Sequence, residues 1–419
     1  MTAKGISRRN FLGTAIGGAL AAPMVPRAGF GAAKPIVVGN LQDLTGFLAP
    51  YGYWYVKAAE AAAARINQEG GILGRPVKLV VEDNQSRPDV AVRKMRKLII
   101  NDEVDFVLGS VHSGIAIATA PVAKAFKTVH FSLAMTSEIT GSKGNRYTFK
   151  VGQHSLFYAT IGHQWAVQTL GKRWTIAVAD YAYGRAHAED WPPLVKKVGG
   201  EVLDRIYIPV GTTDFVPYLV KIQPKTDVLF HVFPGTDSLN FLEQLHKLGI
   251  AKNMAVLGAI CTLDGTDAYD FMEGHWYFTS LPRLQEDVPQ EIRRYDTALR
   301  QAVGAPPDGR AAANRPGLTG GHYWHAWAAM FLLKKGVELS KWQAKKDNPA
   351  FIEALEQDLR FPASHEFPQG EVYLRGVDHH AMHDMYLEQV TKGNLRVKAR
   401  LAMKEGVYAP LTDFRKETL

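Results

Sequence analysis

Two short turns rich in hydroxyl groups are the stretches of this sequence best suited to bind a small anion. Residues 110–114 end one buried apolar run, and residues 134–137 end the next. A helix is predicted to begin at Ser113, and a helix N-terminus stabilises an anion through its free N–H groups and dipole, without any Arg or Lys. A serine at such a position is also common simply as a helix cap. Thr136 in the second turn favours the binding interpretation.

A second group with candidate chemistry lies near the end of the chain. His379, His383 and Asp384 have the residue types of a zinc site, and histidines four apart share one face of a helix. The surrounding pattern predicts strand, loop and strand instead, so we expect no metal and no cofactor. The sequence also has no Gly-x-Ser-x-Gly elbow, no phosphate-binding loop followed by Lys and no Cys-His signature, so it gives no positive sign of an enzyme.

The two turns need neighbouring parallel strands to bring them together. Strands and helices alternate over the first hundred or so folded residues, with strands expected at 36–41, 77–82, 106–108 and 129–133. The alternation restarts after residue 152, with strands expected at 175–179, 201–208, 228–233 and 255–258. The carboxyl edge of a parallel sheet is where open α/β sheets bind ligands. Two such units predict two lobes with a ligand cleft between them.

Composition and the N-terminus set the class of protein. The 419 residues are 46% hydrophobic and 21% charged, as in an ordinary globular α/β protein of two or more domains. Ser7-Arg8-Arg9-Asn10-Phe11-Leu12 and the following short apolar run predict a twin-arginine signal peptide over residues 1–33. It carries four basic residues and no acids, so the formal charge of +8 falls to 8 − 4 = +4, too small a surplus to indicate nucleic acid. The single Cys261 cannot form an internal disulfide.

Several short motifs follow one another along almost the whole folded chain. They are Leu44-Thr45-Gly46 with Tyr51-Gly52, the run 66–77, Glu82-Asp83-Asn84 with Pro88, the turn 109–114, the stretch 132–136, Tyr183-Gly184, and Gly265 with Glu273-Gly274. In this order they resemble the periplasmic solute-binding proteins of ABC importers, of the branched-chain amino-acid type. The resemblance covers residues 36 to about 400.

The resemblance implies a fold and a site. The fold class is α/β, with two doubly wound, Rossmann-like lobes with parallel central sheets, joined by a three-strand hinge. Residues 34–152 and 283–362 would form the first lobe, 153–282 and 363–410 the second, and 411–419 a C-terminal tail. The family's ligand contacts map onto residues of both lobes: Ser113, Ala134 and Thr136 for a carboxylate, Tyr51 and Tyr183 as aromatic walls, and Val111 and His112 beside them.

One departure from the amino-acid binders concerns the ligand's amine. Those proteins place an acid just after the strand ending at Gly258, where this chain has Ala259-Ile260-Cys261. A buried ammonium needs a charged partner. Asp237 or Asp264 could supply one if the loops are shifted. Without it, the ligand would be a carboxylate or amide that lacks an α-amino group.

The expected function is therefore ligand capture and not catalysis. By the resemblance, the chain would be the periplasmic component of an ABC transporter, exported by the twin-arginine pathway and monomeric. It would bind a branched-chain amino acid or a related aromatic or keto acid by hinge closure and deliver it to an inner-membrane permease. A periplasmic sensor of short amides and an exported hydrolase are the alternatives.

Overall fold

The structure is a computed structural model that describes residues 33–260, 270–318 and 323–419. Residues 1–32 of the predicted signal peptide, Cys261, Asp264 and Gly265 lie outside the described residues. Within those described ranges, no helix combines the length and apolarity needed to cross a bilayer.

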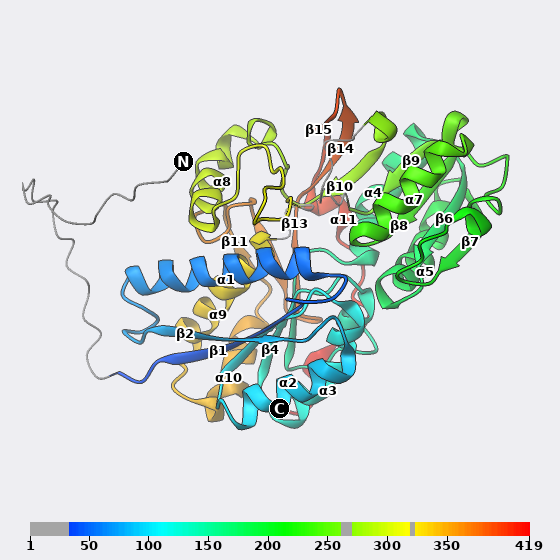
Figure 1. The fold of residues 1–419 in the computed structure, drawn as a ribbon. Coiled ribbons are helices and arrows are strands. Elements are labelled where there is room, and N and C mark those ends of the chain that lie inside the picture. Colours follow the sequence, from blue (N-terminus) through cyan, green and yellow to red (C-terminus); the bar gives the residue numbers. More distant parts are fainter. Residues whose placement is uncertain (1–32, 261–269, 319–322) are drawn as a thin grey trace, which may run out of the picture.

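Two sheets divide the chain into two lobes (Figure 1). The first sheet has eight strands in the order β11-β12-β13-β5-β4-β3-β1-β2, and it is parallel from β13 to β2. β11, β12 and β13 pair antiparallel at one edge. The strands are β1 Ile36–Gln42, β2 Val77–Asp83, β3 Phe106–Gly109, β4 Val129–Ser132, β5 Thr148–Val151, β11 Leu359–Phe361, β12 Val372–Arg375 and β13 His380–His383.

The second sheet has seven strands in the order β15-β14-β10-β9-β8-β6-β7. It is parallel from β10 to β7, while β10, β14 and β15 pair antiparallel. Both sheets therefore have the expected parallel centre, with antiparallel strands added at one edge. The strands are β6 Arg173–Ala179, β7 Glu201–Ile208, β8 Val228–Val232, β9 Ala255–Gly258, β10 Trp276–Thr279, β14 Met385–Thr391 and β15 Asn394–Leu401.

Helices cover the sheets (Figure 1). The eleven α-helices of the described residues are α1 Ala49–Gln68, α2 Pro88–Ile100, α3 Ser113–Ala125, α4 Ser155–Thr169, α5 Ala182–Lys197, α6 Val216–Leu219, α7 Gly235–Lys247, α8 Gln290–Val303, α9 Tyr323–Ser340, α10 Asn348–Leu355 and α11 Met403–Gly406. α1 packs against α9 because its alanines allow close approach and α9 is apolar on nearly every face. The central strands β3 and β4 are buried throughout, as expected when helices cover both faces.

The chain passes between the lobes in three short segments, 152–154, 280–289 and Asp384. The third lies later than the expected boundary at residue 363, because β12 and β13 belong to the first sheet, where His380 and Ala381 pair with β5. Residues 411–419 are also more than a free tail. Phe414 is 2% exposed and its N–H donates to the carbonyl of Val377, so this segment packs on the first lobe.

Candidate ligand-binding site

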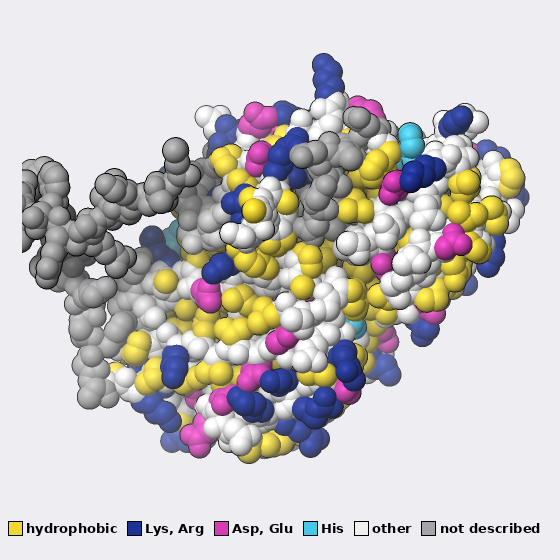
Figure 2. All heavy atoms as spheres, in the orientation of Figure 1, with side chains coloured by type: hydrophobic (Ala, Val, Ile, Leu, Met, Phe, Trp, Pro, Cys, Tyr) yellow, Lys and Arg dark blue, Asp and Glu magenta, His cyan; other side chains and the backbone are white. Residues whose placement is uncertain are grey.

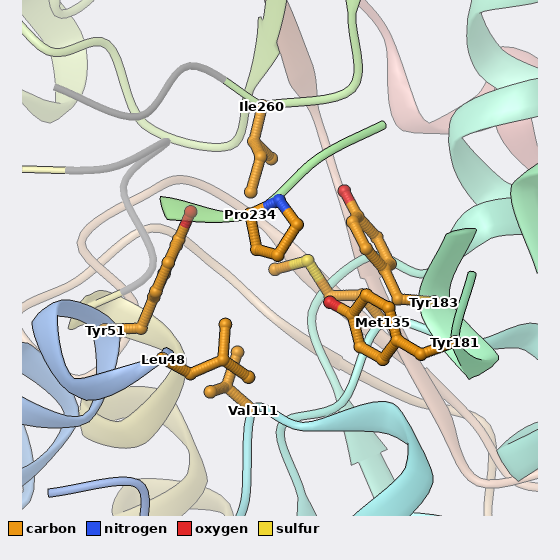
Figure 3. A pocket seen from close by; sticks show the side chains of 8 residues that line it. All are labelled: Leu48, Tyr51, Val111, Met135, Tyr181, Tyr183, Pro234 and Ile260. Carbon is orange, nitrogen blue, oxygen red and sulfur yellow. The ribbon is translucent and has the colours of Figure 1, made fainter. Parts of the chain in front are cut away.

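A cavity lies where the two lobes face each other (Figure 3). The space that a water-sized molecule can occupy in it is about 20 Å³, room for about one water, so a larger ligand needs the lobes or the lining side chains to move apart. Four lining residues come from the first lobe and four from the second: Leu48, Tyr51, Val111, Met135, Tyr181, Tyr183, Pro234 and Ile260. None of these side chains carries a formal charge, so the cavity is suited to an apolar or aromatic body.

Most of the lining residues follow the carboxyl end of a parallel strand. Val111 follows β3, Met135 follows β4, Tyr181 follows β6, Pro234 follows β8 and Ile260 follows β9. This is the edge at which doubly wound sheets bind ligands. Leu48 and Tyr51 come instead from the start of α1. The sheets therefore position the cavity, and short turns supply its walls.

The buried carboxyl group of Asp43 holds the turn after β3 in place. The Ser110 hydroxyl donates to Asp43 Oδ2 at 2.5 Å and accepts the N–H of His112 at 3.0 Å. Burial raises the pKa of Asp43 to about 6, despite hydrogen bonds that lower it. The path of the chain into α3 is thus fixed before any ligand binds.

The residue that caps the N-terminus of α3 is His112, so the alternative in which Ser113 is only a helix cap does not apply. His112 Nδ1 accepts the N–H of Ile115 at 3.2 Å, and burial lowers the pKa of this imidazole to about 4. The Ser113 hydroxyl is therefore not used to cap the helix. Its side chain is 1% exposed, and its hydroxyl has no hydrogen-bond partner among the described residues. Ser113 is two residues from the wall residue Val111, and a buried, unpaired hydroxyl at a helix N-terminus can donate to an anion.

The second predicted turn approaches the cavity through a different residue. Ala134 and Thr136 are both fully buried and flank Met135, whose side chain lines the cavity. The Thr136 hydroxyl caps the short 3₁₀ helix Ser137–Thr140 by accepting the N–H of Glu138, at 3.4 Å. Ala134 and Thr136 therefore lie in the layer behind the wall in this structure.

Tyrosine hydroxyls are the polar groups of the cavity wall. Tyr183 is 3% exposed and its hydroxyl has no partner among the described residues, while burial raises its pKa well above the usual range. The Tyr51 hydroxyl accepts the N–H of Gly235 from the opposite lobe at 3.4 Å.

Glycine at position 184 is required, because a Cβ there would lie 2.0 Å from the carbonyl oxygen of Ala179. The Tyr183-Gly184 motif thus sets α5 directly against the end of β6.

Three aromatic rings close one side of the cavity across the lobes. Tyr181 of the second lobe lies edge-on to Phe47 and His112 of the first, with ring centroids 5.7 and 5.4 Å apart. Phe47 and His112 are themselves 5.5 Å apart. Such edge-to-face pairs are favourable beyond their buried area. Tyr181 therefore contributes to lobe contact as well as to the wall.

The candidate acids for a ligand amine are not in the described wall. Asp237 accepts the N–H of Gly211 at 2.8 Å and does not line the cavity. Asp264 lies outside the described residues. Ile260 does line the cavity, at the place where the resemblance would have put an acid. The described part of the wall thus offers an ammonium group no carboxylate.

The predicted site residues separate into two groups. Tyr51, Val111 and Tyr183 line the cavity. His112, Ala134 and Thr136 each adjoin a lining residue in the chain, and Ser113 is two residues from Val111. The sequence reasoning missed Leu48, Met135, Tyr181 and Pro234 as wall residues. A usable signal existed for Tyr181, which lies two residues before Tyr183 in the same strand-ending turn.

The histidines near the C-terminus are each engaged by protein groups. His379 contacts the Glu356 carboxylate through Nε2 at 3.0 Å, and His383 contacts Gln153 through Nε2 at 3.1 Å. Within the described ranges, no group of three or more His, Cys, Asp or Glu side chains is arranged to hold a metal ion.

Two α/β lobes with a cavity between them are the arrangement of the periplasmic binding proteins, a class without enzymatic activity. The family model described as periplasmic binding protein matches residues 35–394. The chain therefore belongs to the periplasmic binding protein family.

Individual relatives are distant. The Leu/Ile/Val-binding protein BraC3 of Rhizobium johnstonii is 26% identical over 338 residues, covering 78% of this chain and 85% of the relative. A periplasmic binding protein of Burkholderia mallei superposes with a TM-score of 0.76 at 21% identity, covering 91% of this chain and 98% of the other. A Rhodopseudomonas palustris solute-binding protein in complex with 4-hydroxybenzoate gives 0.74 at 22% identity, covering 88% and 96%.

Proposed function

We propose that this solute-binding protein captures a small carboxylate that lacks an α-amino group, with an aromatic acid as the leading candidate. The observation that carries the proposal is Ile260 in the cavity wall, together with the uncharged character of all eight lining side chains. An ammonium group buried against these eight described side chains would lose its hydration, and none of them supplies a charged partner, which costs several kcal/mol.

The carboxylate end and the apolar body have separate partners in this proposal. The carboxylate lies at the N-terminus of α3, where the Ser113 hydroxyl and the first backbone N–H groups are available donors. The body lies between Tyr51, Tyr181 and Tyr183, whose rings suit an aromatic ligand. The 4-hydroxybenzoate complex of the R. palustris relative supports this ligand class, and the name of the Rhizobium relative supports branched-chain amino acids instead.

The remaining steps follow from two lobes that share one ligand. A ligand that contacts both lobes favours their closed arrangement by its differential contacts. The closed form then delivers its ligand to an inner-membrane permease. We further propose that the chain reaches the periplasm by the twin-arginine pathway, as residues 7–12 indicate, and acts there as a monomer.

A thermal-shift panel tests the ligand class. The panel contains 4-hydroxybenzoate, 3-phenylpropanoate and phenylpyruvate, with L-leucine, L-phenylalanine and acetamide as the competing chemistries. A ligand present at a hundredfold excess over its Kd stabilises the folded protein by about 2.7 kcal/mol, which gives a clear rise in Tm. We expect the acids to stabilise the protein. Stabilisation by the α-amino acids alone would refute the proposal, and stabilisation by acetamide alone would favour an amide sensor.

A further inference from the structure

The C-terminal segment makes a fourth connection between the lobes, which the three-strand hinge did not include. α11 packs against α4 in the second lobe, and the chain then returns to the first lobe, where Phe414 is buried. Glu417 forms an ion pair with Lys124 of α3 at 2.7 Å. Residues 407–413 therefore span the two lobes and run past the hinge.

Tyr408 of this segment joins two histidines that belong to two other chain crossings. Its hydroxyl lies 2.7 Å from His154 Nε2 and 3.2 Å from His380 Nδ1. His154 ends the first crossing as the cap of α4, and His380 is in β13 just before the third crossing. The two imidazole rings stack with centroids 4.2 Å apart and planes 18° apart. Three of the four chain crossings thus meet at one group, which we call the hinge triad: His154, His380 and Tyr408.

The partners of the hinge triad fix where its protons lie. His154 Nδ1 accepts the N–H of Phe157 at 3.3 Å, so the proton of a neutral His154 is on Nε2, which lies 2.7 Å from the Tyr408 hydroxyl and 3.1 Å from the Thr140 hydroxyl. His380 Nε2 lies 2.9 Å from the carbonyl oxygen of Gly152, so it donates and leaves Nδ1 as an acceptor. The Tyr408 O–H can then donate to His380 Nδ1 while its oxygen accepts from His154. With both histidines neutral, each N–H and O–H group of the hinge triad then has an acceptor.

Protonation of either histidine disrupts this hydrogen-bond arrangement. A proton on His154 Nδ1 faces the N–H of Phe157 and removes the α4 cap. A proton on His380 Nδ1 turns the acceptor of the Tyr408 O–H into a second donor that faces the hydroxyl. Two protonated rings stacked at 4.2 Å would also repel each other. The observed hydrogen bonds of the hinge triad therefore require both histidines to be neutral.

The surroundings also oppose a positive charge. Burial lowers the pKa of His154 and of His380 well below the usual range, and the charges of Lys150 and Arg375 act in the same direction. The nearby Asp378 carboxylate is held by Arg375 in a buried ion pair at 2.6 Å. Two further ionisable groups, His187 of α5 and His383 of β13, are buried with lowered pKa values. Asp190 of α5, whose pKa burial raises to about 6, is bonded to Ser155 next to the triad.

We propose that the hinge triad is a proton-sensitive lock on lobe closure, with Tyr408 as its positioning residue. When both histidines are neutral, the triad holds the crossings in the arrangement that brings the lobes together. Rotation of the lobes separates the three groups and admits water, so the open protein takes up a proton in acid that the closed protein excludes. Acidification therefore opens the protein and weakens ligand binding. The lock does not depend on which carboxylate fills the cavity.

Calorimetric titration of the full chain tests the lock through the protons exchanged on binding. The probe is 4-hydroxybenzoate, or L-leucine if the former does not bind, in buffers of different ionisation enthalpy. If one histidine with a pKa near 6.5 in the open form must lose its proton on closure, binding releases about 0.8 proton at pH 6.0 and the Kd is about tenfold weaker at pH 5.5 than at pH 7.5. Binding without proton release and without this pH dependence would overturn the lock and leave the proposed function intact, whereas binding of neither probe would count against the proposed function.

Matched variants separate the hinge triad from the other buried histidines. His154→Gln and His380→Gln keep a donor and an acceptor but cannot titrate, so both should bind well at pH 7.5, and the one that replaces the titrating histidine should lose most of the proton release. His231→Gln is the control, because His231 is equally buried but packs within the second lobe against Phe233 and Phe241. Proton release that persists in both triad variants, or that disappears in the control, would overturn the lock.

Tyr408→Phe provides a milder variant in case the glutamine substitutions impair folding. It removes only the shared hydroxyl and leaves the ring packed. Because the lost hydrogen bonds belong to the closed arrangement, the Kd at pH 7.5 should rise about two- to tenfold. An unchanged Kd in a folded Tyr408→Phe protein would also overturn the lock.

Discussion

Replacement of Ser113 by alanine should move ligand affinity and protein stability in opposite directions. The Ser113 hydroxyl is 1% exposed and has no partner among the described residues, so the ligand-free protein bears the cost of burying it unpaired, about 1–3 kcal/mol. In the proposed complex the same hydroxyl would donate to a carboxylate, and a hydrogen bond to a charged group contributes about 1.5–3 kcal/mol. Ser113→Ala should therefore raise the Kd about 10- to 150-fold and leave the ligand-free protein as stable or slightly more stable.

Titration calorimetry with 4-hydroxybenzoate and urea unfolding of the ligand-free protein measure the two effects. Thr119→Val is the matched control on the same helix, because the Thr119 hydroxyl already donates to the carbonyl of Ile115 at 2.8 Å. The control should lose stability without losing affinity. If Ser113→Ala instead leaves the Kd unchanged, or loses stability and affinity together, Ser113 is a structural residue and not a carboxylate donor.

Three further outcomes follow from contacts in the structure. Tyr181→Ala removes an aromatic contact between the lobes and should weaken ligand binding about tenfold with little change in Tm; unchanged affinity would exclude a role in closure. Arg300→Ala leaves the buried carboxylate of Asp296 without its ion-pair partner and should destabilise the protein by about 3–5 kcal/mol in urea unfolding, a value that a loss below 1 kcal/mol would contradict. Burial lowers the pKa of His130 to about 4, so this group favours the folded state above pH 6.5 and loses that contribution as the pH falls from 6.5 to 4. His130→Gln should accordingly reduce the stability difference between pH 7 and pH 5 by about 2 kcal/mol, and an unchanged difference would show that His130 is not buried in the neutral form.

The sequence was sufficient where local patterns decide the structure. The strands at 201–208 and 255–258 and the start of α3 at Ser113 were predicted at the positions observed, because apolar runs and Gly or Ser residues mark their ends. The sequence was insufficient where pairing between distant segments decides the structure. The third crossing lies at Asp384 because β13 pairs with β5, more than two hundred residues earlier in the chain.

The cavity wall shows the same division. Tyr51 and Tyr183 were predicted from motifs, and both line the cavity. His112 was expected among the ligand contacts, and in the structure its imidazole caps α3 and does not line the cavity. Tyr181 and Met135 were missed because the direction of a side chain in a turn depends on what the opposite lobe presents. Tyr408 could not be found from its own neighbourhood, since its partners are 254 and 28 residues away.

The most direct measurement compares two ligands that differ only in the amine. L-Phenylalanine and 3-phenylpropanoate share the same ring, chain length and carboxylate, and titration calorimetry at pH 7.5 gives a Kd for each. An ammonium group that is buried beside Ile260 without a carboxylate costs about 3 kcal/mol or more, so 3-phenylpropanoate should bind at least about a hundredfold more tightly. Equal or tighter binding of L-phenylalanine would mean that an acid does reach the cavity and that the protein is an amino-acid binder.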